Sequence, residues 1–169
     1  MSRYRPPQAT GSKYITPEGK QRLEQELDHL WRQRRPEVTR ALTAAAAEGD
    51  RSENAEYIYR KKELREIDSR VRFLRKRLEG IVVVNRSPEN RERVYFGAWV
   101  RLQDISGKEN VYRVVGPDEI DPVRGFISMD SPMGKALLGK SLDDEFSIEL
   151  PCGEADYQII AISYSPMQA

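Results

Sequence analysis

Cysteine and histidine are scarce in this sequence, with one of each among 169 residues. The single cysteine, Cys152, excludes a disulfide within the chain. One cysteine and one histidine are also too few for a zinc site built from such ligands. No apolar run approaches the roughly 18 residues of a membrane-spanning helix, and nothing resembles a signal peptide. These absences favour a soluble, cytoplasmic protein with no membrane partner.

Charge is plentiful but unevenly distributed. Charged residues make up 33% of the chain, and the formal net charge is only +1. Residues 1–80 hold 19 Lys and Arg against 13 Asp and Glu, whereas residues 81–169 hold 9 against 14. A basic half and an acidic half indicate two surfaces with different partners.

A long antiparallel coiled-coil hairpin is predicted for residues 14–80. Thr16-Pro17 is a typical helix start, and apolar residues at helical spacing continue to Ala47. Pro36 is expected to kink this first arm or open its hydrogen bonds. The second arm, to about residue 79, carries an apolar heptad seam. Its members are Leu64, Ile67, Val71, Leu74 and Leu78. Each arm would be about 40–45 Å long.

The remaining residues predict a small α+β domain over 81–169, with an antiparallel sheet. Runs rich in β-branched and aromatic residues alternate with turns that contain glycine, proline or charged residues. The expected strands are 81–84, 94–102, 111–115, 126–129, 146–150 and 157–164, and a short helix is expected over 132–138. Residues 1–13 contain little apolar pattern and are expected to form a disordered tail.

Two carboxylates, Asp50 and Glu53, mark the turn between the arms. Their spacing of three allows both to face one side of a helix start. Such oxygen ligands suit Mg²⁺, although two are too few for a freestanding site. The same spacing fits a capping box, and Asp50 or Ser52 would then cap the second helix. The two interpretations are compatible, since a cap can fix the orientation of the carboxylates.

A basic stripe follows the turn on the second arm. Between residues 60 and 77 it holds nine Lys and Arg against three Asp and Glu. Such a stripe favours a phosphate backbone, and Tyr57 and Tyr59 beside it could stack on an unpaired base. The alternative is a solvated coiled-coil face with charge pairs at spacings of four.

Several segments in the same order resemble the Gre family of bacterial transcript-cleavage factors, and within it the GreB branch. The turn sequence is Gly49-Asp50-Arg51-Ser52-Glu53-Asn54-Ala55-Glu56-Tyr57. The other matching segments are residues 31–38, 67–72, 96–100 and 130–133. The resemblance extends from residue 15 to about residue 164.

The resemblance implies a monomeric elongation factor rather than an enzyme. Its hairpin would enter the secondary channel of bacterial RNA polymerase and stimulate cleavage of the 3′ end of the nascent RNA in backtracked complexes. Asp50 and Glu53 would be the catalytic pair, holding Mg²⁺ jointly with the polymerase, and the isolated protein would bind none. The RNA-binding residues would be Arg60, Lys61, Lys62 and Arg65. The second domain would be FKBP-like and would dock on the coiled coil at the channel rim through Asp130, Ser131, Pro132 and Met133.

Three other functions compete with this one. A regulator could occupy the channel without stimulating cleavage, and it would not need the Asp50 and Glu53 pair. A freestanding nuclease would need further metal ligands or a general base near the turn, and the sequence offers none. A peptidyl-prolyl isomerase rests on fold analogy alone.

Overall fold

The computed structural model describes residues 11–47, 54–86, 88–150 and 153–167. These residues form two compact units. One is the hairpin from Lys20 to Ile81, and the other combines residues up to Gly19 with those from Val82 onward. The α+β class is confirmed, while most of the tail predicted for residues 1–13 lies outside the described residues. None of the helices in the described part of the chain is long and apolar enough to cross a membrane.

The first arm of the hairpin contains three consecutive helical segments. Helix α1 covers Pro17–His29, a π-helical segment covers Leu30–Arg34, and α2 covers Arg35–Ala47. As predicted, Thr16 caps the start, because its hydroxyl accepts a hydrogen bond from the Gly19 amide at 3.0 Å. The π segment ends where the Arg35 amide bonds to the Leu30 carbonyl, one residue further back than in an α-helix. The predicted disturbance beside Pro36 therefore takes the form of a wide helical turn.

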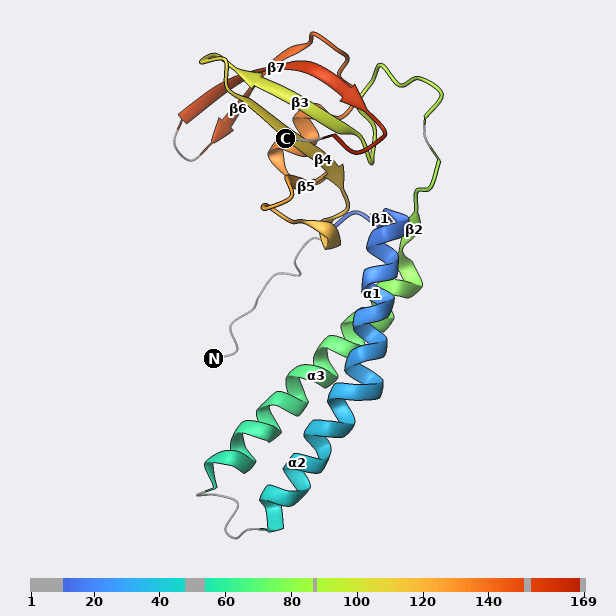
Figure 1. The fold of residues 1–169 in the computed structure, drawn as a ribbon, viewed down its shortest axis with the longest axis vertical. Coiled ribbons are helices and arrows are strands. Elements are labelled where there is room, and N and C mark those ends of the chain that lie inside the picture. Colours follow the sequence, from blue (N-terminus) through green and yellow to red (C-terminus); the bar gives the residue numbers. More distant parts are fainter. Residues whose placement is uncertain (1–10, 48–53, 87, 151–152, 168–169) are drawn as a thin grey trace, which may run out of the picture. The chain divides into compact units, whose positions relative to one another are not determined.

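Helix α3, Ala55–Gly80, forms the second arm and runs antiparallel to α1 and α2 (Figure 1). The predicted seam holds the arms together, with Ile67 and Val71 buried against Val38. Further along α3, Leu74 has no exposed surface. The core of the hairpin is therefore a single apolar stripe between two helices.

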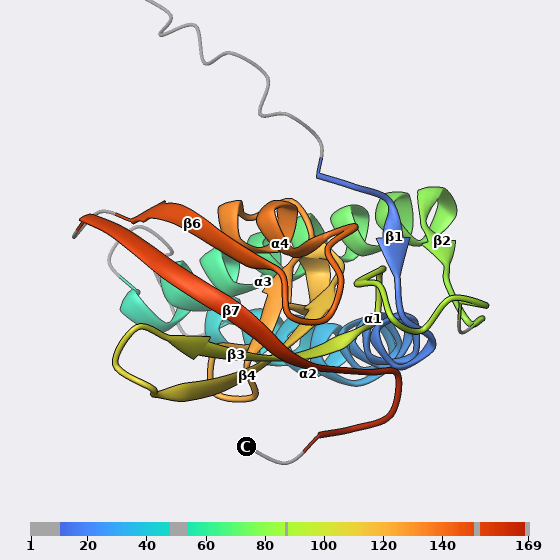
Figure 2. The same ribbon diagram turned by 90° about the horizontal axis from the view of Figure 1, so that it is seen from above.

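The other unit is built on a five-stranded sheet in the order β5-β4-β3-β7-β6. The strands are β3 (Trp99–Asp104), β4 (Glu109–Val115), β5 (Phe126–Ser128), β6 (Glu145–Leu150) and β7 (Gly153–Ser163). Strands β6, β7, β3 and β4 lie side by side in Figure 2. The β4–β5 pair is parallel, so the prediction of an antiparallel sheet was wrong at that edge. A 3₁₀ turn, Pro117–Glu119, lies in the connection that carries the chain back to the start of β5.

Smaller elements complete this unit. Strands β1 (Tyr14–Ile15) and β2 (Val82–Val83) form a parallel pair, and helix α4 covers Pro132–Leu137. Side chains from β3, β4, β7 and α4 form its buried core. The fully buried members are Val94, Ala98, Val100, Leu102, Val114, Leu137 and Ile159.

One predicted strand begins later than expected. The sequence predicted a strand from residue 94, but β3 starts at Trp99. Gly97 has a φ of 85°, a left-handed conformation that interrupts an extended strand, and its amide donates to the Val114 carbonyl at 2.7 Å. Val94 and Ala98 are still buried. The apolar pattern therefore predicted the buried positions correctly, but it placed the start of the strand too early.

A buried carboxylate, Glu119, joins the start of α1 to the rest of this unit. Its side chain is only 2% exposed. It accepts hydrogen bonds from the amides of Thr16 at 3.0 Å and Gly116 at 3.1 Å, and from the Thr16 hydroxyl. Gly19 leaves room for it, since a Cβ atom there would lie 2.1 Å from the carboxylate oxygen. The sequence reading did not anticipate this network.

Candidate functional site on the hairpin

The predicted catalytic pair, Asp50 and Glu53, lies outside the described residues, as does the turn predicted for residues 48–52. The structure describes the two ends of that turn. Helix α2 ends at Ala47, and the chain is described again from Asn54. The placement of the carboxylates therefore stays a prediction, while the residues on either side of the turn are described.

Asn54, the first described residue after the turn, forms hydrogen bonds to both arms. Its side-chain oxygen accepts a hydrogen bond from the Tyr57 amide at 3.0 Å, which makes Asn54 the N-cap of α3. Its side-chain nitrogen donates to the Ala45 carbonyl on the first arm at 2.8 Å. The expectation that Asp50 or Ser52 caps this helix was therefore wrong. One side chain both starts α3 and links the two arms, directly after Glu53 in the sequence.

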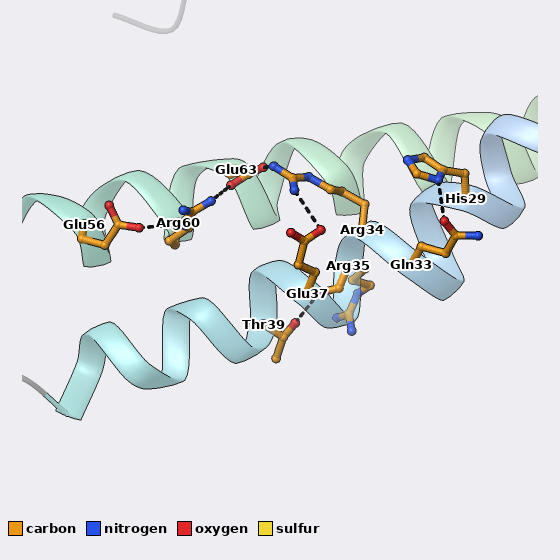
Figure 3. Close-up of polar contacts among 9 residues, drawn as sticks. All are labelled: His29, Gln33, Arg34, Arg35, Glu37, Thr39, Glu56, Arg60 and Glu63. Carbon is orange, nitrogen blue, oxygen red and sulfur yellow. Dashed lines mark hydrogen bonds and ion pairs between the residues drawn. The ribbon is translucent and has the colours of Figure 1, made fainter.

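A chain of ion pairs crosses the hairpin beyond this turn (Figure 3). Glu56 pairs with Arg60 at 2.7 Å, and Arg60 also pairs with Glu63 at 3.0 Å. Glu63 in turn binds Arg34 of the first arm, and Arg34 pairs with Glu37 at 2.9 Å. The hydrogen bonds that Arg34 and Arg60 donate to these carboxylates raise the pKa of both arginines above the ordinary value. The charges of Arg34 and Arg60 are therefore already directed at neighbouring carboxylates.

The ion pairs show which of the predicted RNA-binding residues already have a carboxylate partner. Of the four, Arg60 is paired twice, and Lys62 lies 3.9 Å from Glu66. Lys61 sits over the Tyr57 ring at 5.5 Å. Arg65 pairs with no carboxylate in the described part of the chain. Part of the stripe is therefore the solvated, charge-paired face that was the alternative, and RNA binding by these four residues stays a prediction.

Two more ion pairs join the arms nearer their other end. Arg35 pairs with Asp68 at 2.8 Å. Arg70 binds both oxygens of Glu26, at 2.6 and 2.8 Å. This bidentate hydrogen bonding lowers the pKa of Glu26 below its ordinary value. Exposed pairs of this kind each contribute about 0–1 kcal/mol, so they set the alignment of the arms more than the stability of the hairpin.

The predicted polymerase-binding loop lies in the sheet unit, and its four residues differ in what they offer. The Asp130 carboxylate accepts a hydrogen bond from the Ser12 amide at 2.7 Å. Ser131 is the N-cap of α4 and accepts from the Gly134 amide at 3.0 Å. Pro132 is exposed, whereas Met133 packs partly buried against the sheet core. Pro132 and Asp130 therefore remain as candidate contacts, while Met133 also has a packing role.

Comparison with known proteins shows the family of this chain. The family description "Transcription elongation factor, N-terminal" matches residues 13–83, and "Transcription elongation factor, GreA/GreB, C-term" matches residues 88–164. The chain belongs to the GreA/GreB family of transcription elongation factors. The predicted resemblance is confirmed.

Named relatives of this GreA/GreB-family chain are similar over nearly their whole length. Transcription elongation factor GreB of Pseudomonas aeruginosa is 58% identical, over 98% of this chain and 99% of the relative. That of Xanthomonas axonopodis pv. citri is 57% identical, over 99% of this chain and 100% of the relative. A crystal structure of GreA factor homolog 1 of Thermus thermophilus is 30% identical, covers 89% of this chain and 97% of that one, and gives a TM-score of 0.41.

Sequence reasoning missed several residues of this GreA/GreB-family hairpin. Asn54 was read only as part of a family motif, although an Asn immediately before a helix is a recognised capping signal. Trp31 was read in the same way, although the guanidinium carbons of Arg75 and Arg35 lie 4.4 and 5.2 Å from the centre of its ring. Among the described residues, no group of three or more Asp, Glu, His or Cys could hold a metal ion. The metal-binding role predicted for Asp50 and Glu53 stays a prediction.

Proposed function

We propose that this chain stimulates RNA cleavage by RNA polymerase. It would enter the secondary channel of a backtracked polymerase with its hairpin and bring Asp50 and Glu53 to the 3′ end of the nascent RNA. In this role it is a cofactor of the polymerase and performs no catalysis alone. The observation that supports the proposal best is the family match over residues 13–83, because this segment contains both carboxylates and the arms that carry them.

The length and rigidity of the hairpin suit this task. Helix α3 has 26 residues, which corresponds to about 39 Å. Asn54 ties the arms together where the turn begins, and the ion pairs from Glu56 to Glu37 continue the link along both arms. A turn held at its base in this way loses less conformational freedom when it binds.

The chemistry of the two carboxylates fits Mg²⁺. Carboxylate oxygens are ligands that Mg²⁺ prefers, and two of them leave positions for ligands from the polymerase and the RNA phosphate. When bound, the metal would lower the pKa of the attacking water and stabilise charge at the phosphate. Asp50 and Glu53 would hold and orient it, and Glu53 is followed directly by the capped start of α3.

Docking on the rim of the channel would involve the loop from Asp130 to Met133. Pro132 is exposed, and the backbone around it is fixed, because Ser131 caps α4 and also donates to the Ser128 carbonyl at 2.6 Å. The Asp130 carboxylate is engaged by Ser12. Any polymerase group that binds this carboxylate would therefore compete with, or add to, an existing hydrogen bond.

The test is a cleavage assay on a stalled, backtracked polymerase complex with Mg²⁺. The parent protein should release short 3′ RNA fragments, and alone it should leave RNA intact. The double variant Asp50→Asn/Glu53→Gln should lower the cleavage rate at least about 100-fold. Its affinity for the polymerase should change less than about threefold, because the carboxylates would act on the metal.

A matched control separates the metal role from a general loss of negative charge. Glu48→Gln/Glu56→Gln removes the same number of carboxylates from positions that flank the pair. We expect this variant to cleave at close to the parent rate. Equal losses in both double variants would show that charge alone is needed. Parent-like cleavage by Asp50→Asn/Glu53→Gln would reject the metal role, and polymerase binding without cleavage by the parent would favour a channel regulator.

A further inference from the structure

A groove lies on one face of the sheet unit, beside the turn that precedes β5. It has a volume of about 650 Å³. Alternate residues of a strand point to opposite faces of a sheet, and Val100 and Leu102 of β3 belong to the buried core. Trp99 and Arg101 of β3 line the groove, so it lies on the face opposite that core. Its other lining residues include Val111 of β4, Pro122, Val123 and Arg124 of the turn, and Met167. We call this surface the outer groove.

The turn beside the outer groove has a fixed backbone. The Asp121 carboxylate accepts hydrogen bonds from the amides of Val123 and Arg124, at 3.1 and 3.2 Å. Gly125 has a φ of 70°, and a Cβ atom there would lie 2.4 Å from the Val111 carbonyl oxygen. Glycine is therefore required where the turn meets β4. The side chains of this turn are thus presented from a backbone that is held in place.

Apolar side chains gather around the outer groove. Val123 is 97% exposed, and Pro122 next to it is also exposed. Trp99, Val111 and Met167 are half-buried and line the same hollow. A single exposed valine is ordinary, but apolar side chains collected around a hollow are typical of protein-binding surfaces.

Arg124 adds a positive charge to this apolar surface. Arg101 pairs with Glu109 at 3.6 Å, whereas Arg124 has no carboxylate partner in the part of the chain that the structure describes. The Arg124 guanidinium carbon lies 4.3 Å from the centre of the Phe126 ring. A cation–π contact of this kind holds the guanidinium group without neutralising it. One oriented guanidinium group therefore stands beside the exposed Val123.

We propose that the outer groove docks a segment of RNA polymerase that carries an apolar side chain next to a carboxylate. The proposal rests on the proposed function, in which the polymerase is the partner. The planar guanidinium fork of Arg124 matches a carboxylate through two parallel hydrogen bonds. The apolar side chain would pack among Trp99, Val111 and Val123, and apolar anchors in such hollows contribute much of the binding energy of an interface.

The charge of the sheet unit favours a protein carboxylate over a nucleic acid. Residues 81–169 hold 9 Lys and Arg against 14 Asp and Glu, so the unit as a whole repels a polyanionic backbone. A single carboxylate responds mainly to charges within the screening length of about 8–10 Å. Among the residues that line the groove, Arg101 and Arg124 exceed Glu109 by one charge. The local excess therefore attracts a carboxylate in an otherwise acidic unit.

The outer groove is separate from the predicted polymerase-binding loop. The turn ends at Gly125 and the loop begins at Asp130, at opposite ends of β5. About 15 Å of extended chain separates these two residues. One polymerase surface could contact both places, and the groove would then add affinity that the loop alone does not supply.

The proposal is tested by biolayer interferometry, with the full-length protein on the sensor and core RNA polymerase in solution. Val123→Ser/Arg124→Gln should weaken binding about tenfold, because it removes the apolar contact and the guanidinium fork. Arg124→Glu should weaken binding about thirtyfold, because it places a like charge against the carboxylate. Arg124→Lys should bind more tightly than Arg124→Gln but less tightly than the parent, because it keeps the charge and loses the fork. Far-UV circular dichroism checks that each variant is folded.

Ile105→Ser/Arg91→Gln is the matched control. It removes the same kinds of side chain from exposed positions of the same unit, and neither residue lines the outer groove. We expect a loss of less than about twofold. Equal losses in the two double variants would overturn the proposal, because general surface polarity and charge would then explain the binding. Binding of Arg124→Glu as tight as that of the parent would also overturn it, because the docked segment would not be acidic.

Two further measurements detect a different occupant of the outer groove. In the first, Val123→Ser/Arg124→Gln binds polymerase like the parent but binds a fluorescein-labelled polyuridylate more weakly, which would assign the groove to RNA. In the second, sedimentation velocity shows a dimer of the parent that this variant loses, again with unchanged polymerase binding. That result would assign the groove to a second copy of this chain. Either result would overturn the proposal.

The cleavage assay separates this proposal from the proposed function. Val123→Ser/Arg124→Gln should need about tenfold more protein for half-maximal cleavage. If the parent binds polymerase through the groove but never stimulates cleavage, the proposed function fails and the outer groove stands. If the parent stimulates cleavage while Val123→Ser/Arg124→Gln binds polymerase as tightly as the parent, the outer groove fails alone.

Discussion

The hairpin and the sheet unit are stabilised in different ways. The hairpin has a single apolar stripe between two helices, and its charged side chains pair across the surface. The sheet unit encloses a core on several sides and buries a carboxylate with three hydrogen-bond donors. A stripe between two helices can relax when a side chain is removed, whereas an enclosed core leaves a cavity.

This difference suggests a division of tasks. The hairpin carries charged side chains that pair between its two arms. The sheet unit fixes the start of α4 with side-chain hydrogen bonds of Ser131. Two tryptophans, Trp31 in the hairpin and Trp99 in the sheet unit, allow each unit to be followed by fluorescence after the other is changed to phenylalanine.

The largest expected difference comes from removing one buried leucine from each unit. Leu102 of β3 and Leu74 of α3 both have no exposed surface. Leu102→Ala should lower the free energy of unfolding by about 4 kcal/mol and Leu74→Ala by about 2 kcal/mol, because only the enclosed site keeps its cavity. Urea unfolding, followed by the tryptophan of the affected unit, measures both. Equal costs would contradict the comparison.

A second test concerns the buried carboxylate of Glu119. Glu119→Gln keeps the shape but loses one accepting oxygen, which leaves a donor near Thr16 unsatisfied. We expect a loss of about 2–3 kcal/mol in the sheet unit. Glu154→Gln, on the exposed start of β7, is the control and should change stability by less than about 0.5 kcal/mol. A Glu119→Gln protein as stable as the parent would show that the network is not needed.

Helix caps give a matched pair of smaller effects. Asn54→Ala should cost the hairpin about 1 kcal/mol through the lost cap, and more through the lost link to Ala45. Ser131→Ala should cost the sheet unit about 1 kcal/mol. Asn54→Ser restores the cap but not the link, so its stability should lie between those of Asn54→Ala and the parent. If Asn54→Ser and Asn54→Ala unfold at the same urea concentration, the cap adds nothing.

The smallest effect is a pH dependence confined to the hairpin. Arg70 lowers the pKa of Glu26 below its ordinary value of 4.5. The stabilisation is therefore complete above pH 4.5 and is lost as the pH falls through the lowered pKa. Unfolding followed by Trp31 fluorescence should show this loss in the parent and not in Glu26→Gln. The same loss in Glu26→Gln and the parent would assign it to other carboxylates, and Glu24→Gln serves as a control.

The sequence predicted the elements well where periodicity is strong. The seam residues Ile67, Val71 and Leu74 are buried as expected, and the short helix begins at Pro132. The parallel β4–β5 pair was missed because pairing direction depends on the path of the connection, not on the strand pattern. Glu119 was missed because a charged residue in a turn normally lies at the surface.

The candidate site was harder to predict than the fold. Residue type showed that the second arm is basic, but not which cations are neutralised. That depends on rotation about α3, which places Arg60 beside Glu63 and Arg75 over Trp31. The capping role of Asn54 was hidden for a similar reason, since Asp50, Ser52 and Asn54 are all good capping residues and only the start of α3 decides between them.

The wide turn at Leu30–Arg34 makes the first arm one residue longer than a regular helix would need over the same span. The excess residue changes the phase of everything before it by about 100° relative to α2. Loss of a single residue there would thus swing Trp31 away from Arg75 while leaving Val38 in its place against Ile67. The length of the hairpin would hardly change, yet the side chains exposed on this face would be different ones. A small length change at this point would therefore alter which side chains of the first arm face α3 without rebuilding the hairpin.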